Sequence, residues 1–342
     1  MRRAATLLLA AGFATLAASA PVLGAGAQEA AAQEAAGPEP APPAAAERDR
    51  LNGFAITRQT VDRAEIVPGG PPRDGIRSID DPRFVPSEDA TWVDDGTPVL
   101  GVVRKEDARA YPVHLMDYHQ IANDVVGGLP LAVTWDPLTG VPRAFERTVD
   151  GRTLTFGVSG LIYNSGFLMY DRETESLWSQ FLGQAISGPL AGKRLARVPI
   201  RQEDLTSWRT RVSNTRVLER PLPTKIDYRF SPFEKYLVED STRFPVKASD
   251  ERFHAKELVL GVVAGGEARA YLGSILTREG GWAEDTLQGR KIQIDYSSEL
   301  AVFRWEAPAD VEVTEAYWFA WKAFHPDTKI WKDPGAVRRR EP

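Results

Sequence analysis

The chain has 342 residues, of which 43% are hydrophobic and 26% are charged, and its net charge is -5. This composition allows a normal core in one large domain or two ordinary ones, and the negative charge argues against nucleic acid or an anionic membrane as a main partner. The absence of cysteine excludes thiolate metal sites, cysteine nucleophiles and thiol redox chemistry.

The first residues are typical of a secretory signal peptide. Arg2 and Arg3 precede an uncharged run rich in Ala and Leu, which ends in the small residues Ala25-Gly26-Ala27. We therefore predict a signal peptide over 1–27 and an exported protein, periplasmic or secreted, with no membrane span after cleavage. An uncleaved membrane anchor is the alternative, because the run is long enough to cross a bilayer.

Residues 28–50 consist mainly of Ala, Pro, Glu and Gln. Such a tract cannot bury enough apolar surface to offset the entropy lost on ordering. We predict a disordered linker over these residues. An N-terminal extension over 51–75 then precedes the main folded part.

Two stretches of the chain match each other closely. VLGVVRKEDARAY at 99–111 and VLGVVAGGEARAY at 259–271 agree at nine of thirteen positions without a gap. A weaker match joins WRTRVSNTRVL at 208–218 to WKAFHPDTKIW at 321–331. We infer an internal tandem duplication from these matches.

The two copies predict the same order of elements. Each begins with a β-branched run, a four-residue turn and an alternating run, which together predict a β-hairpin at Val99–Val103 and Ala108–Tyr111. Further strands are expected near 130–135 and 291–296, and a short helix followed by a strand is expected near Thr206 and Glu315. The expected fold class is α+β, mainly β, with two related lobes at 76–239 and 240–342, the second ending in a short basic tail.

The segment after the first hairpin contains a histidine that the second copy lacks. HLMDYHQIAND at 114–124 is predicted to be a helix with His119 and Asn123 on one face. The corresponding GSILTREGGWAED has no histidine. His119 is therefore either a pocket residue, together with Asp136 and Asn164, or a hydrogen-bonded structural residue.

The first lobe carries a β-rich insertion. Arg143 and Trp208 lie 65 residues apart whereas Arg304 and Trp321 lie 17 apart, so the first copy has 48 extra residues. Within them, FLMYDR and LWSQF flank ETES and predict a hairpin with apolar side chains on both faces, as in the centre of a sheet. The insertion serves either as a binding face or as a cap that joins the lobes.

A resemblance to a known family covers nearly the whole mature body, from about Ile76 to YWFAWKAFHPDTKIW. It rests on RAYPVHLMDYHQIANDVVGGLPLAVTWDPLTG, VDGRTLTFGVSGLIYNSGFLMYDRETESLWSQ and GPLAGKRL. The chain resembles the exported family called domain of unknown function 3179, and this resemblance implies no activity. The family pattern has Cys where this chain has Asp136 and Thr139, and a His matched by His119. The thiols that would imply a metal or redox site are missing, so we expect no zinc, copper or iron and no cofactor.

These features predict a ligand pocket in the first lobe, where the insertion faces the helix with His119 and the WDPL loop. The predicted lining residues are His119, Asp136, Asn164, Ser165, Tyr170, Trp178 and Gln180. GVSG is followed by Leu161, so it is not a nucleophile elbow, and no metal quartet is recognisable. We therefore interpret the protein as a non-catalytic binding or scaffold protein whose partner is a small molecule or an envelope protein. The alternative is an enzyme with hydrolase-like or redox-related chemistry that uses the polar pocket residues.

Overall fold

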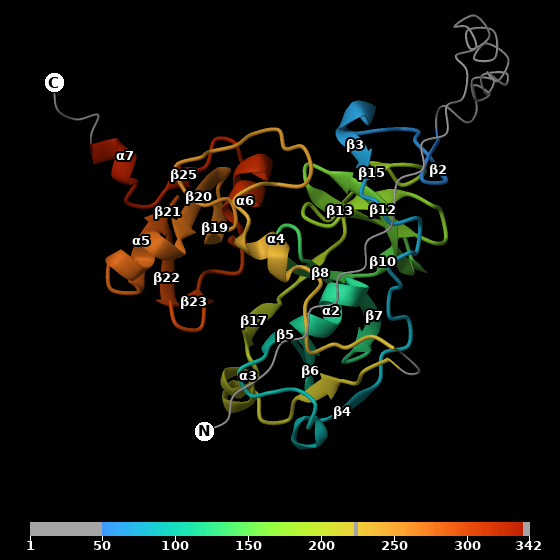
Figure 1. Cartoon of the computed structure of the whole chain (residues 1–342), viewed down its shortest axis with the longest axis horizontal. Coiled ribbons are helices and arrows are strands. Elements are labelled where there is room, and N and C mark those ends of the chain that lie inside the picture. Colours follow the sequence, from blue (N-terminus) through green and yellow to red (C-terminus); the bar gives the residue numbers. More distant parts are fainter. Residues whose placement is uncertain (1–49, 222–224, 338–342) are drawn as a thin grey trace, which may run out of the picture. The chain divides into compact units, whose positions relative to one another are not determined.

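The computed structural model describes residues 50–221 and 225–337, all within the unit Asp49–Pro342. The predicted signal peptide, nearly all of the predicted linker and the basic tail after 337 lie outside the described residues. Within the described ranges, no helix is both long and apolar enough to cross a membrane. Strands far outnumber helices (Figure 1), which confirms the mainly β prediction.

The first hairpin lies inside a five-stranded sheet. It consists of β5 (Pro98–Arg104) and β6 (Asp107–Pro112), with Leu100 paired to Tyr111. The turn has two residues rather than the predicted four, because the ladder continues to the pair Arg104 and Asp107. The sheet order is β17-β5-β6-β18-β4, so β17 (Arg201–Asp204) and β4 (Phe84–Pro86) are its edge strands and β18 (Arg216–Leu218) lies between β6 and β4.

The second hairpin has the same pairing 160 residues further along the chain. It consists of β19 (Leu258–Ala264) and β20 (Glu267–Leu272), with Leu260 paired to Tyr271. A parallel strand lies next to the second strand of each hairpin in the sheet: β18 pairs with β6, and β25 (Lys329–Ile330) pairs with β20. An antiparallel strand pairs with the first: β17 with β5, and β24 (Glu312–Tyr317) with β19. The matching sequences thus form matching local structure.

A short helix follows the antiparallel strand in both places. These helices are α3 (Leu205–Arg211) and α6 (Trp318–Phe324). A Cβ atom on Gly101 would lie 2.2 Å from the ring of Trp208 in α3, and one on Gly261 would lie 2.2 Å from the ring of Trp321 in α6. Only glycine therefore lets either tryptophan pack this closely on its hairpin. The helix expected near Glu315 begins later, at Trp318, because the preceding residues form β24.

The predicted helix over 114–124 is shorter than expected. It forms α2 (Val113–His119) and ends where Gln120 takes a left-handed φ of 58°. The following residues form β7 (Ile121–Val126), because their β-branched side chains suit a strand that pairs with β8 (Leu129–Asp136). The placement of Asn123 on a helical face with His119 was therefore wrong.

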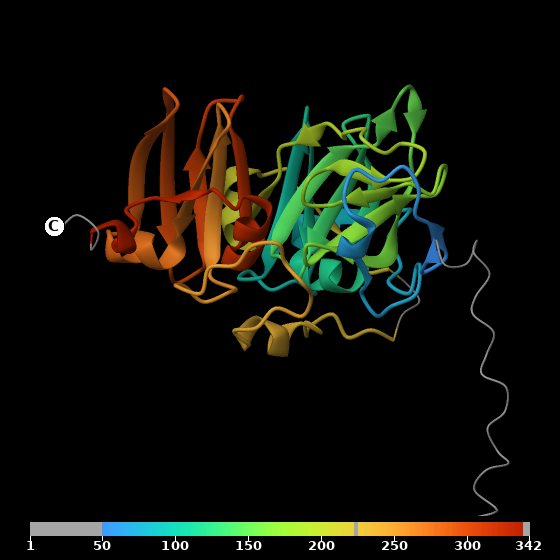
Figure 2. The same ribbon diagram turned by 90° about the horizontal axis from the view of Figure 1, so that it is seen from above.

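The two hairpins lie in two halves of the described chain, 76–239 and 240–337, and each half also contains an antiparallel meander. In the first half, β7 and β8 are joined by β9 (Val141–Glu146) and β16 (Arg197–Val198) in the order β16-β9-β8-β7. In the second half, α5 (Gly273–Arg278) precedes β21 (Trp282–Leu287), β22 (Arg290–Ser297) and β23 (Val302–Glu306). Figure 2 shows these second-half strands in orange with short helices near their ends. The strands predicted near 130–135 and 291–296 are confirmed as β8 and β22.

The insertion forms its own five-stranded sheet. Its strands are β12 (Phe156–Tyr163), β13 (Gly166–Asp171), β14 (Leu177–Ser179) and β15 (Gln184–Ser187), joined by β3 (Ile66–Pro68) in the order β15-β14-β13-β12-β3. β13 is thus a central strand, and the predicted hairpin around ETES is confirmed. Asn164 and Ser165 form the turn between β12 and β13 with φ of 51° and 65°, respectively.

Smaller elements complete the described chain. Two ribbons consist of β1 (Arg50–Leu51) with β2 (Phe54–Ala55), and β10 (Thr148–Val149) with β11 (Arg152–Thr153). The remaining helices are η1 (Arg63–Glu65), η2 (Ser87–Asp89), α4 (Glu234–Val238) and α7 (Pro334–Val337).

The apolar residues of the two halves form separate cores with similar members. The first core contains Leu100, Val102, Tyr111, Met116 and Val133, and the second contains Leu260, Val262, Tyr271, Leu276 and Ile294. A further core joins the insertion to one face of the β7–β9 meander through Ile121, Ala132 and Phe145. The insertion therefore covers a sheet face of the first half.

Candidate functional site

The predicted site residues are all buried, and each of them forms at least one hydrogen bond with another protein group. Their exposed fractions range from zero to 9%, the highest being that of His119. His119 Nδ1 lies 2.7 Å from the carbonyl oxygen of Arg77, and its Nε2 lies 2.7 Å from the hydroxyl of Tyr228. Burial lowers the pKa of His119. These contacts agree with the second alternative from the sequence, in which His119 is a hydrogen-bonded structural residue.

The β12–β13 turn is tied to the second half of the chain. Asn164 Nδ2 donates to the carbonyl of Ala323 at 2.8 Å, and its Oδ1 accepts from the backbone N–H of Lys247 at 2.8 Å. The Ser165 hydroxyl donates to the carbonyl of Phe244 at 3.4 Å. Both side chains thus hold the insertion against later segments of the chain.

The other predicted residues of the insertion are held within the first half and the N-terminal extension. The Tyr170 hydroxyl donates to Asp74, and the Trp178 indole N–H donates to Asp171 at 2.8 Å. Gln180 Nε2 donates to Thr134 Oγ1 at 3.0 Å and to the carbonyl of Val141 at 2.9 Å. Each of these side chains thus has a partner within the protein, whereas the buried Gln180 Oε1 has none among the described residues.

The structure does not bring His119, Asp136 and Asn164 to a common partner. Two cavities of the described chain, of about 340 Å³ and 630 Å³, are lined by other residues. The contribution of the seven predicted residues to ligand binding stays a prediction.

The loop at Asp136 is instead a junction between distant segments. The Asp136 carboxylate accepts the backbone N–H groups of Leu138 at 3.0 Å and Phe167 at 3.1 Å. The hydroxyl of Tyr236 donates to the carbonyl of Leu138 at 2.8 Å, and the backbone N–H of Tyr317 donates to the carbonyl of Thr139 at 2.8 Å. Burial raises the pKa of Asp136 to about 6, against the effect of the hydrogen bonds that it accepts.

A cavity of about 340 Å³ lies beside this loop. Two of its walls are α2 and the end of β8 with the following loop, through Trp135 and Pro137, which is where the sequence predicted a pocket. Its other walls come from α4, from Pro98 and Gln202 of the first five-stranded sheet and from the second half, rather than from the strands of the insertion. The apolar lining residues are Val113, Phe233, Leu237, Leu258, Leu300 and Val302.

Four titratable side chains contribute to the lining: His114, Asp117, Lys256 and Tyr317. Asp117 accepts a hydrogen bond of 2.7 Å from the indole N–H of Trp135, and burial raises its pKa. Burial lowers the pKa of Lys256, whose ammonium group donates to the carbonyls of Glu239 and Ser241. The cavity therefore combines apolar walls with a buried carboxyl group and a largely engaged cation.

Sequence reasoning missed most of these residues, although some lie in motifs that it quoted. Asp117 stands two positions before His119 in HLMDYHQ, and Tyr317 begins the C-terminal YWFAWKAFHPDT. Both motifs therefore marked the region, although His119 rather than Asp117 was predicted to line the pocket. Lys256 follows no recognisable pattern, so only the tertiary structure could identify it.

Among the described residues, no group of three or more His, Cys, Asp or Glu side chains is placed to hold a metal ion.

A family model described as "Protein of unknown function (DUF3179)" matches residues 73–308 of the chain. No curated protein and no solved structure has significant similarity to the chain.

Proposed function

Because the chain belongs to the DUF3179 family, whose description names no activity, we propose its function from the cavity beside the Asp136 loop. The protein binds a small molecule there without converting it. The ligand has an apolar body and one polar group that meets Asp117. This proposal keeps the predicted place of the pocket, at α2 and the WDPL loop, and replaces the walls expected from the insertion.

The observation that carries this proposal is the combination of apolar walls with one buried carboxyl group. Ligand cavities typically have apolar linings and a few fixed polar groups that orient the ligand. Asp117 is 6% exposed, and the Trp135 indole holds one of its carboxylate oxygens. A fixed carboxyl group in an apolar wall distinguishes ligands by the hydrogen bonds that they offer.

The second candidate is an enzyme that uses Asp117 as a general acid or base. Burial raises the pKa of Asp117, and a carboxyl group so placed holds its proton to higher pH than a free one. The two functions differ in the fate of the ligand. A ligand recovered from the protein should keep its mass if the protein only binds it. A mass change with the wild type but not with Asp117→Asn would favour the enzyme.

The cavity can be tested with the fluorescent dye anilinonaphthalene sulfonate, which binds apolar surfaces. We expect saturable binding to the wild type. Leu300 lines the cavity and is 46% exposed, so Leu300→Trp should fill part of the cavity without disturbing the core. Dye affinity measured by fluorescence titration should fall about tenfold or more.

Val238 provides the matched control, because it ends α4, is 80% exposed and does not line the cavity. Val238→Trp should leave dye affinity unchanged. Equal affinities for the wild type and Leu300→Trp would contradict the proposal.

We further propose that the two halves arose by tandem duplication and form two related lobes, about 76–239 and 240–342. Support comes from the equal hairpin registers, the equal order of added strands and the Gly101–Trp208 and Gly261–Trp321 contacts. Superposition of the two lobes in an experimentally determined structure tests this proposal. Matching hairpins that failed to superpose together with their meanders would contradict it.

We also propose export of the chain with cleavage after Ala27. The proposal is supported by the basic start, the apolar run and the Ala-Gly-Ala end. N-terminal sequencing of the exported protein should begin at Gln28. A retained Met1 in a membrane fraction would instead show an uncleaved anchor.

A further inference from the structure

A second and larger cavity, of about 630 Å³, lies between the two halves of the described chain. One wall is formed by α3 and β17 of the first half, and the other by the β21–β23 meander of the second half. We call it the meander groove. Its lining includes Arg201, Arg211, Trp282, Asp295, Arg304 and Trp305.

The meander presents a polar face to this groove. Trp282 pairs with Asp295, and Asp295 pairs with Arg304 across the three strands. Paired residues of antiparallel strands point to the same side, so these three side chains form one row. Trp282 is 52% exposed, although aromatic rings of this size are usually well buried. A wide apolar surface thus stands beside charged groups in an open groove.

The charged groups of the groove balance each other. Arg211 pairs with Glu203 at 2.6 Å, and Arg304 lies 3.4 Å from Asp295. Arg304 also donates to the hydroxyl of Ser207 at 3.3 Å, so it joins both walls of the groove.

The third arginine, Arg201, stacks over the ring of Trp305 at 4.5 Å, and Glu306 adds a third carboxylate to the lining. Three guanidinium groups and three carboxylates leave the lining without net charge. The groove therefore favours no strongly charged ligand.

The corresponding face of the first half is closed. Ile121, Thr134 and Arg143 occupy the row equivalent to Trp282, Asp295 and Arg304, if the proposed duplication is used to align the halves. The insertion covers this face and places Phe181 parallel to Phe324 of α6, with ring centres 4.0 Å apart. Arg143 donates to the carbonyl of Phe181 and to Thr314 Oγ1. The insertion thus fills one of two equivalent grooves and leaves the other open.

We infer that the meander groove binds a neutral oligosaccharide. Hydroxyl groups of a sugar both donate and accept hydrogen bonds, so they suit a lining of paired guanidinium, carboxylate and hydroxyl groups. The apolar face of a sugar ring can pack on the exposed indole of Trp282. An open groove between two walls accommodates a chain of sugars rather than an enclosed small molecule.

The test uses the full exported chain and three neutral probes: cellohexaose, maltohexaose and chitohexaose. Titration calorimetry should show saturable binding to at least one probe. Trp282→Ala should lower its affinity about tenfold or more, because an exposed indole contributes most of the apolar contact. Arg304→Ala should also lower the affinity, because it removes donors shared by both walls.

Phe230→Ala is the matched control, since Phe230 is an aromatic residue with 57% exposure that does not line the groove. The affinity of the Phe230→Ala variant for the probe that binds should equal that of the wild type. Binding should also be nearly independent of salt, because the ligand is uncharged.

Failure of all three probes to bind would overturn the inference, as would binding that Trp282→Ala leaves unchanged. Polygalacturonate, an anionic polymer, provides the remaining comparison. Tighter, salt-sensitive binding of polygalacturonate that depends on Arg304 would overturn the neutral assignment. None of these results depends on dye binding in the cavity at Asp117.

Discussion

At the scale of single residues, the Asn164 side chain joins distant segments of the chain. Its amide binds the chain at Ala323 and Lys247. Asn164→Ala should lower the free energy of unfolding by about 2 kcal/mol, because the buried carbonyl of Ala323 and the partly buried N–H of Lys247 lose their partner. Urea denaturation measures this loss.

Asn214→Ala is a control, because Asn214 is exposed. Asn164→Gly separates the two contributions of this residue: glycine keeps the left-handed backbone easily but makes no side-chain hydrogen bond. Full stability in Asn164→Gly would mean that the backbone conformation, and not the hydrogen bonds, matters at this turn.

Asp136 should make stability depend on pH. Burial raises its pKa in the folded state to about 6, above its usual value in an unfolded chain. The folded state therefore binds this proton more tightly, and the associated stability is full at low pH and is lost as the pH rises through about 6.

Relative to Asp136→Asn, the wild type should lose about 2 to 3 kcal/mol of unfolding free energy between pH 4 and pH 7. Denaturant titrations of both proteins across this range measure the difference. Parallel pH profiles would show that the carboxyl group has an ordinary pKa.

At the scale of elements, the same glycine and tryptophan contact fixes a helix on a hairpin in both halves. Gly101→Ala and Gly261→Ala should each lower the free energy of unfolding by about 2 kcal/mol or more, because the added methyl group would overlap a buried indole ring. Thermal and chemical denaturation measure both losses. Gly96→Ala is the control, since a Cβ atom there meets nothing within 4 Å. Equal stability of all three variants would show that the indole rings move aside easily.

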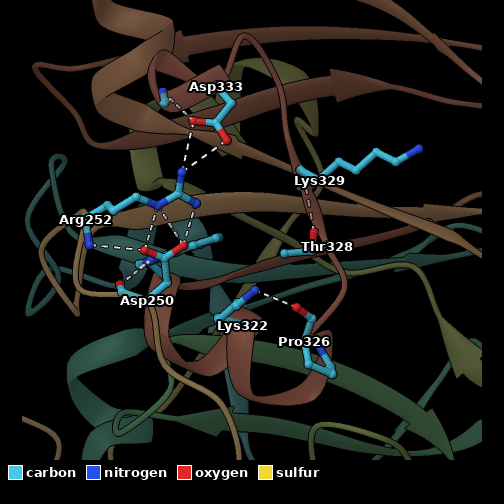
Figure 3. Close-up of polar contacts among 9 residues, drawn as sticks. Asp250, Arg252, Lys322, Pro326, Thr328, Lys329 and Asp333 are labelled. Carbon is cyan, nitrogen blue, oxygen red and sulfur yellow. Dashed lines mark hydrogen bonds and ion pairs between the residues drawn. The ribbon is translucent and has the colours of Figure 1, made fainter. Parts of the chain in front are cut away.

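At the scale of the whole described chain, Arg252 holds the C-terminal segment in place. Figure 3 shows its guanidinium between Asp250 and Asp333, and Asp333 also accepts the backbone N–H of Gly335 at 2.8 Å. Arg252→Ala should change global stability by about 1 kcal/mol or less, because the ion pairs are partly exposed. It should nevertheless speed amide exchange at Gly335, because the contact that anchors Asp333 is lost.

Arg229→Ala is the matched control for this experiment. Arg229 forms a fork with Asp227 two positions earlier, as Arg252 does with Asp250, but it has no contact with Asp333. Exchange at Gly335 should be unchanged in this variant. Unchanged exchange in Arg252→Ala as well would show that the segment is anchored by its other contacts.

The sequence by itself determined the local strand pattern and the family. The hairpins at 99–111 and 259–271, the central strand β13 and the hairpin around ETES were predictable, because alternating apolar residues and turn residues act over a few positions. The end of α2 was not predictable in the same way. Residues 121–126 satisfy both a helical and an extended pattern, and only pairing with β8 made them a strand.

The tertiary structure alone decided where the candidate sites lie. The cavity beside the Asp136 loop joins Asp117 to Lys256 and Tyr317, and the meander groove joins Arg201 to Trp282 and Arg304. No local pattern records such distant neighbours, because burial depends on which faces meet after folding. The polar residues of the insertion show the same division. Their sequence indicates that they need partners, and the packed structure shows that Asn164, Trp178 and the Gln180 amide nitrogen find them within the protein.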